Sequence, residues 1–236
     1  MDSVVKSARI AGAFYLAEIL LGPFSLIYVP STLIVGGDAA ATADKILAHE
    51  MLFRFGIVGD LVGGVLALFV PLALYRLFRG VDKDTAALMV ILGGLMVTPI
   101  FFLNALNWIA ALVLIHGAPF LSAFDTAQRD ALAMLFLRLH GQGNTIGEIF
   151  WGLWLFPFGA LVVKSGFLPK LLGYWLILGG FAYVAISLIG LLVPQYEDQA
   201  FAFAQPALFG EIAVTLWLLI KGASVRPAPE AAPSAP

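Results

Sequence analysis

The chain has 236 residues, of which 61% are hydrophobic and only 12% charged, about half the charged fraction typical of soluble proteins. Its formal net charge of −2 gives no signal for nucleic-acid binding, and the absence of cysteine excludes disulfides, thiolate nucleophiles and cysteine-bound zinc. Charges this sparse, with a mean hydropathy of +0.97, predict an all-α, multi-pass integral membrane protein surrounded by the lipid bilayer.

Six apolar stretches are long enough to cross a bilayer as helices. The first extends from Ile10 to Val35, well beyond the roughly 7–15 residues of a signal-peptide core, so we interpret it as an uncleaved helix. Prolines fall inside four stretches and predict kinks in these helices. The six stretches are Arg9–Val35, Phe55–Tyr75, Ala86–Ile115, Ile146–Val163, Leu171–Val193 and Ala207–Ile220.

We therefore expect residues 1–222 to form one six-helix transmembrane domain. The Ala/Pro-rich stretch over residues 223–236 has no apolar face to bury, which predicts a disordered tail.

Lysine and arginine indicate the orientation of the bundle, because they are enriched in cytoplasmic loops. With a cytoplasmic N-terminus, nine of them fall on the inner side and four on the outer side, so both termini are expected in the cytoplasm. The inner set is Lys6, Arg9, Arg76, Arg79, Lys83, Lys164, Lys170, Lys221 and Arg226, and the outer set is Lys45, Arg54, Arg129 and Arg138.

Two outer loops are long and amphipathic. Residues Asp38–Arg54 read as a short helix that Asp38 can cap, and Asp125–His140 carry leucines at helical spacing. Both are expected to lie as short helices along the outer membrane interface.

A repeated pattern opens three inward helices. Gly147-Glu148-Ile149 and Gly210-Glu211-Ile212 are each followed, after three residues, by Leu-Trp-Leu, and Gly59-Asp60 opens a third apolar run. The pattern indicates three parallel helical-hairpin repeats, as in some transporters. Chance self-similarity in a chain rich in Leu, Ala, Gly and Phe is the alternative.

Several polar side chains lie inside apolar stretches, where an ionisable group is costly and marks a candidate functional site. We expect them to converge on a pocket that opens to the outside and accepts a cation, a proton or an amine. The candidate ligand-binding residues are Glu18, Asp60, Asn104, Asn107, Glu148 and Glu211.

These acids also have structural interpretations. Thr145 and Glu148 match a capping box, which would make Glu148 part of a helix start. Asp60, Glu148 and Glu211 each precede a small residue by four positions and can therefore lie on a close-packing face. Arg54 is a natural ion-pair partner for one of them.

The sequence shows no pattern for a metal or a cofactor. His49 and His140, each placed in an outer loop, lack the spacing of a metal motif, and no phosphate-binding loop or nucleophile elbow is present. We therefore predict no metal and no cofactor.

Stretches distributed along the chain resemble the bacterial membrane family known as domain of unknown function 4386, which implies a six-helix protein of the bacterial cytoplasmic membrane without an assigned activity. The resemblance also draws attention to Glu50 and Arg54, four apart on one helical face, as a possible ion pair. The similar stretches are Ala8-Arg9-Ile10-Ala11-Gly12 with Tyr15, Gly37 to Ala43, Glu50 to Arg54, Tyr75-Arg76-Leu77, and Lys164 to Pro169 leading to Gly173.

Three functions remain open at this point. The leading one is binding or transport of a small solute or cation in an outward-facing acidic pocket. The second is an intramembrane enzyme that acts on a lipid or isoprenoid with paired carboxylates as acid and base. The third is a non-catalytic accessory or sensor subunit whose acids only pack helices.

Overall fold

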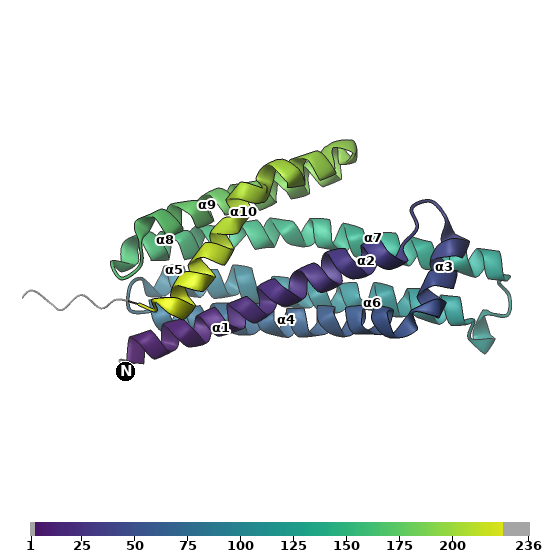
Figure 1. The fold of residues 1–236 in the computed structure, drawn as a ribbon, viewed down its shortest axis with the longest axis horizontal. Helices are drawn as coiled ribbons and strands as arrows, with labels where there is room; N and C mark the ends of the chain where they lie inside the picture. Colours follow the sequence, from purple (N-terminus) through teal and green to yellow (C-terminus); the bar gives the residue numbers. More distant parts are fainter. Residues whose placement is uncertain (1–2, 224–236) are drawn as a thin grey trace, which may run out of the picture.

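Six long helical segments run side by side in the computed structural model, which describes residues 3–223 (Figure 1). Each is long and apolar enough to cross a membrane, so the predicted number and approximate positions of the spans are confirmed. The segments are α1 (Ser3–Pro23) with α2 (Val29–Leu33), α4 (Glu50–Phe78), α5 (Lys83–Val90) with α6 (Val97–His116), α7 (Thr126–Leu153) with α8 (Leu155–Ser165), α9 (Lys170–Leu192) and α10 (Glu197–Ile220).

The two described chain ends meet at one end of the bundle, where Gly222 lies beside Val5; we call this the terminal end. The opposite end, the α3 end, carries the short helix α3 (Ala39–Ala48) and the connection from α6 to α7 (Figure 1). The predicted tail over residues 223–236 lies outside the described residues except for Ala223, which is buried.

The six segments close into a ring. In ring order, α1 packs on α4, α4 on α6, α6 on α7, α7 on α9, α9 on α10, and α10 returns to α1. Close approach is built into the sequence: a Cβ on Gly159 would lie 2.5 Å from the carbonyl oxygen of Gly173, so only glycine permits this contact between α8 and α9.

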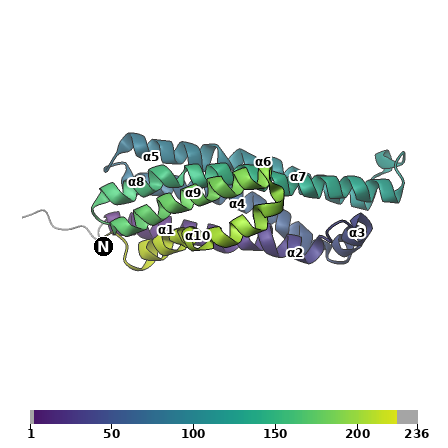
Figure 2. The same ribbon diagram turned by 90° about the horizontal axis from the view of Figure 1, so that it is seen from above.

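The segments differ in length, so α7 extends further toward the α3 end of the bundle than α9 and α10 do (Figures 1 and 2). The segment of α7 and α8 has 40 residues, roughly 60 Å at 1.5 Å per residue, whereas the 23 residues of α9 span about 35 Å. Thr145 lies beside Gly190 near the end of α9, so the first half of α7 projects past the α9–α10 turn.

Three local predictions need correction. The outer helix expected over Asp125–His140 is not a separate interfacial element but the first part of the unbroken helix α7. The helix expected over Asp38–Arg54 is present as α3, capped by Asp38, but it ends at Ala48, and Glu50–Arg54 belong to α4. The capping box is formed by Asp125 and Gln128, and Thr145 lies mid-helix, so Glu148 does not cap a helix start. The last helix begins at Glu197, ten residues before the predicted start, and continues through Pro206.

Irregular turns mark two of the predicted kinks. Pro23 ends α1 and is followed by a π-helical turn over Phe24–Tyr28, and a second π turn over Ile91–Leu95 precedes the first turn of α6, which contains Pro99. A proline cannot donate the backbone hydrogen bond of a regular helix, and a wider turn is a usual accommodation.

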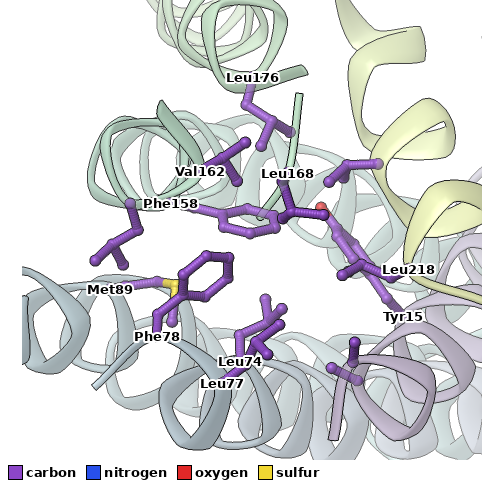
Figure 3. Packing of buried hydrophobic residues seen from close by; sticks show 14 of the residues in the cluster. Tyr15, Leu74, Leu77, Phe78, Met89, Phe158, Val162, Leu168, Leu176 and Leu218 are labelled. Atoms are coloured by element: carbon purple, nitrogen blue, oxygen red, sulfur yellow. The ribbon is translucent and has the colours of Figure 1, made fainter. Parts of the chain in front are cut away.

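The apolar interior consists of two clusters. The terminal-end cluster includes Tyr15, Phe78 and Phe158, whose rings face one another across α1, α4 and α8 (Figure 3). The α3-end cluster is built around Trp108, which is fully buried and stacked on Phe53. At the level of the terminal-end cluster, side chains fill the middle of the helix ring.

Asp82 ties the α4–α5 loop to α8 outside the membrane-spanning segments. Its carboxylate accepts from Lys164 Nζ at 2.7 Å and caps α5 by accepting from the backbone N–H of Thr85 at 3.0 Å. The hydrogen bond from Lys164, then that from Thr85, holds the pKa of Asp82 well below its ordinary value.

We predict that Asp82→Asn lowers the melting temperature of the detergent-solubilised protein at neutral pH. A lowered folded-state pKa contributes stability above the unfolded pKa of about 4, and this contribution is lost as the pH falls further. The difference between wild type and Asp82→Asn should therefore shrink below about pH 4. The neighbouring exposed Asp84→Asn is the control; an equal, pH-independent loss in both variants would refute the assignment.

Candidate functional site

The polar residues singled out in the sequence do not share one pocket. Asp60, Asn104 and Asn107 lie together between α4, α6 and α7, whereas Glu18, Glu148 and Glu211 lie along α1, α7 and α10. The structure thus divides the expected site into two groups.

The first group is centred on a buried pair. His140 Nε2 lies at hydrogen-bond distance, 2.6 Å, from Asp60 Oδ2, and the two side chains are 3% and 1% exposed. The His140 ring lies against Trp108, with 4.3 Å between ring centroids. His140 is therefore not an outer-surface residue, as the sequence indicated, but a buried partner that joins α7 to α4.

Side-chain amides extend this group. Asn104 Nδ2 donates to the carbonyl oxygen of His140 at 2.9 Å and to Asn144 Oδ1 at 2.8 Å, and Asn107 Nδ2 donates to Asn104 Oδ1 at 3.2 Å. Gly143 makes room for the Asn104 side chain, since a Cβ at position 143 would lie 2.3 Å from Asn104 Oδ1. These bonds lock α6 against α7 and give the group a structural character.

The second group begins near the middle of the bundle. The hydroxyl of Tyr15 donates to Glu211 Oε2, and the hydroxyl of Tyr183 interacts with the same carboxylate. Glu18, nearly one helical turn from Tyr15 on α1, lies close enough to Glu211 for their charges to interact. Two phenols thus surround one carboxylate while a second carboxylate lies beside it.

The group continues toward the α3 end. Glu148 is an electrostatic neighbour of both Tyr183 and Glu197, and Thr145 Oγ1 donates to Glu197 Oε1 at 3.2 Å. Ser187 Oγ donates to the carbonyl oxygen of Thr145 at 2.5 Å and fixes α9 against α7 at this level. Glu197 opens α10 at the α9–α10 turn, so the series starts near the edge of the shorter helices.

We name these four acids, Glu197, Glu148, Glu211 and Glu18, the carboxylate row. Glu197 and Glu211 are fourteen residues apart on α10, roughly 20 Å along the helix. Each of the four side chains is half-buried. At its inner end the row meets Tyr15, whose ring packs on Trp154 and Phe158 of the terminal-end cluster, so the row leads inward from the α3 side and stops at apolar side chains.

In the part of the chain that the structure describes, no basic side chain forms an ion pair with the row. Within residues 3–223 the ion pairs join Glu50 to Arg54 and His116, Asp60 to His140, and Asp82 to Lys164, and none includes a carboxylate of the row. Glu148 Oε2 is buried and has no hydrogen-bond partner among these residues. Carboxylates in an apolar bundle are costly to keep charged without a basic partner, which makes the row a candidate functional site.

Arg54 does not pair with any acid of either group. Its Nε donates to Glu50 Oε1 at 2.6 Å, across one helical turn at the start of α4.

Residues 3–223 contain no group of three or more histidine or acidic side chains arranged to hold a metal ion.

Sequence reasoning missed several members of the two groups, among them Tyr15 and Tyr183 as partners of Glu211, Glu197 as the first acid, and His140 as the partner of Asp60. Tyrosines usually lie at the membrane interface, so two tyrosines in mid-span were an available signal. No comparable sequence signal pointed to Glu197 or His140, because the sequence analysis placed both residues in loops.

We predict that His140→Leu destabilises the protein by about 3–5 kcal/mol, because it leaves the Asp60 carboxylate buried without its partner. The double variant Asp60→Asn/His140→Leu should recover part of that loss, since neither side chain is then charged. Thermal or denaturant unfolding measures both, with the exposed His49→Leu as the control. Additive losses in the double variant would show that the two residues do not act as a pair.

Comparisons with known proteins identify a family and one archaeal relative. Residues 10–222 match the model of a family described as domain of unknown function (DUF4386). An uncharacterized protein of the archaeon Archaeoglobus fulgidus is 30% identical over 169 residues, which cover 71% of this chain and 84% of that protein. Relatives therefore extend beyond the bacteria that the sequence resemblance implied.

No solved structure matches the chain. The family match covers both polar groups, most of the first span and the whole of the other five, and the chain belongs to the DUF4386 family of multi-pass membrane proteins.

Proposed function

We propose that this protein binds protons or a small monovalent cation, including a primary ammonium ion, in the carboxylate row. The observation that carries the proposal is the row itself: four half-buried acids on α1, α7 and α10, beside Tyr15 and Tyr183, without a basic partner in residues 3–223. A cation in this position would complete a charge balance that the described side chains leave open.

The shape of the row favours binding with access from one side. Glu197 lies at the α9–α10 turn, and the inner end of the row is closed by the packed rings of Tyr15, Trp154 and Phe158. A ligand would enter from the α3 end and stop at Glu211 and Glu18. A transport cycle would require this apolar cluster to rearrange.

The alternative of a lipid-modifying enzyme has less support. It requires two free carboxylates to act as acid and base on one substrate. Glu18 and Glu211 are neighbours, but both phenols are directed at Glu211, which suits neutralisation or cation binding better than proton exchange with a substrate.

We also propose the orientation indicated by the loop charges, with both termini in the cytoplasm, which puts the α3 end and the entrance of the row outside. The closed ring of helices supports treating residues 1–222 as one transmembrane domain.

The hairpin-repeat hypothesis stays a proposal. It is supported by Glu148 and Glu211, which occupy equivalent positions in the two sequence repeats and both lie near Tyr183. Related sequences in which the two Gly-Glu-Ile elements vary independently would argue against it.

We predict that adding sodium, potassium or methylammonium chloride to the purified protein in weakly buffered detergent at pH 7 raises its melting temperature and releases protons. A cation that binds only the folded state stabilises it by about 2.7 kcal/mol at one hundred times its dissociation constant. Choline chloride at equal ionic strength controls for screening, because its bulk does not suit a site among packed helices.

Glu211→Gln should abolish both responses, while Asp198→Asn, an exposed acid at the start of the same helix, should retain them. Proton release without selectivity among the cations would assign the row to protons. Identical titrations of wild type and Glu211→Gln would show that the acids only pack helices and would refute the proposal.

A further inference from the structure

A groove runs along the outer surface of α4 and α6 at the α3 end, away from the carboxylate row. Its volume is about 650 Å³. Apolar side chains line its length, and two basic side chains lie at its outer end. The residues used below are Arg54, Ile57, Val58, Ile109, Val113 and His116.

The open side of the groove faces the bilayer. Val58, Ile109 and Val113 are exposed on membrane-spanning helices, and the exposed apolar surface continues along both helices toward the terminal end. The surfaces that continue it are Leu61, Val62, Val65 and Phe69 on α4 and Phe102, Leu103 and Leu106 on α6. Membrane lipids surround such a groove, so an acyl chain is its expected occupant.

The polar end of the groove has the chemistry of a phosphate contact. Glu50 accepts from Arg54 Nε at 2.6 Å and lies 3.3 Å from His116 Nε2, so it holds both bases at the mouth of the groove. Arg54 remains 50% exposed and His116 44% exposed. Only Nε of Arg54 is engaged within residues 3–223, which leaves both Nη groups free to donate.

Two adjacent Nη donors match the paired oxygens of a phosphate, and arginine is well suited to this contact because its guanidinium is planar and permanently charged. Basic pockets between membrane helices at the interface are sites for lipid headgroups. We propose that this groove binds one membrane phospholipid, with an acyl chain between α4 and α6 and the phosphate on Arg54 beside His116.

The proposal separates two contributions that two variants can remove. Arg54→Gln removes the phosphate donors and leaves the apolar groove intact. Val113→Trp fills the groove and leaves Arg54 intact. Both positions are exposed on helix surfaces, so neither change alters the two internal clusters. Arg138, a second exposed arginine at the α3 end, beside a smaller hollow, provides the control variant Arg138→Gln.

The experiment is native mass spectrometry of the delipidated full-length protein with phosphatidylglycerol and with a diacylglycerol of identical acyl chains. The wild type should bind phosphatidylglycerol at least tenfold more tightly than diacylglycerol. Arg54→Gln should remove that preference, Val113→Trp should weaken binding of both lipids, and Arg138→Gln should leave binding unchanged.

Three results would overturn the proposal: equal affinities of Arg54→Gln and wild type for phosphatidylglycerol, unchanged binding to Val113→Trp, or displacement of the bound lipid by millimolar inorganic phosphate, which would indicate an anion site without an acyl chain. Cation titrations of the carboxylate row are independent of all three results.

Discussion

The cost of an uncompensated charge inside a low-dielectric bundle governs how this protein is built. Asp60 Oδ2 meets that cost internally, with His140 as a partner at 2.6 Å and with both side chains buried, while Asp60 Oδ1 has no hydrogen-bond partner among residues 3–223. The four acids of the carboxylate row do not, because residues 3–223 supply hydroxyl groups rather than a base. The cost of a buried charge thus distinguishes the Asp60–His140 pair, which is balanced within the protein, from the carboxylate row, which we propose is balanced by a bound proton or cation. This difference is the basis of the proposed function.

Helix α7 connects the two groups because it is longer than a single membrane crossing requires. In its second half, His140 and Asn144 contact α4 and α6, whereas Thr145 and Glu148 face Glu197 of α10. The shorter α9 and α10 turn back at the level of Thr145, which brings Glu197 beside it. The height difference between the two sides of the ring therefore sets where the carboxylate row begins, and the aromatic rings around Tyr15 set where it ends.

The sequence predicted the six spans because twenty-residue apolar runs have few other solutions, and it predicted the Asp38 cap from a local pattern. It could not assign the acids to two groups, since the rotation of each helix about its axis is set by packing between distant segments. His140 shows the difficulty: the amphipathic spacing of Leu132, Leu135, Phe136 and Leu139 was real, but it belonged to a continuous helix in the bundle rather than to a helix on the membrane surface. Glu197 was missed for a related reason, because the last predicted stretch begins at Ala207, whereas α10 begins at Glu197 and continues through Pro206.

Water access to the middle of the carboxylate row is the central claim, and the absence of native cysteine permits a direct measurement. Single cysteines would replace Asp198, Phe203 and Glu211 along α10, and sealed membranes of each orientation would be treated with a charged, impermeant methanethiosulfonate. Thiols react as thiolates, which form only where water reaches them. Asp198→Cys should react and identify the α3 side, expected to be extracellular. Phe203 is 87% exposed on a membrane-spanning helix, so we expect Phe203→Cys to face lipid and not to react. The account predicts that Glu211→Cys reacts from the same side as Asp198→Cys. A Glu211→Cys thiol that is as unreactive as Phe203→Cys, or that reacts only from the terminal side, would contradict it.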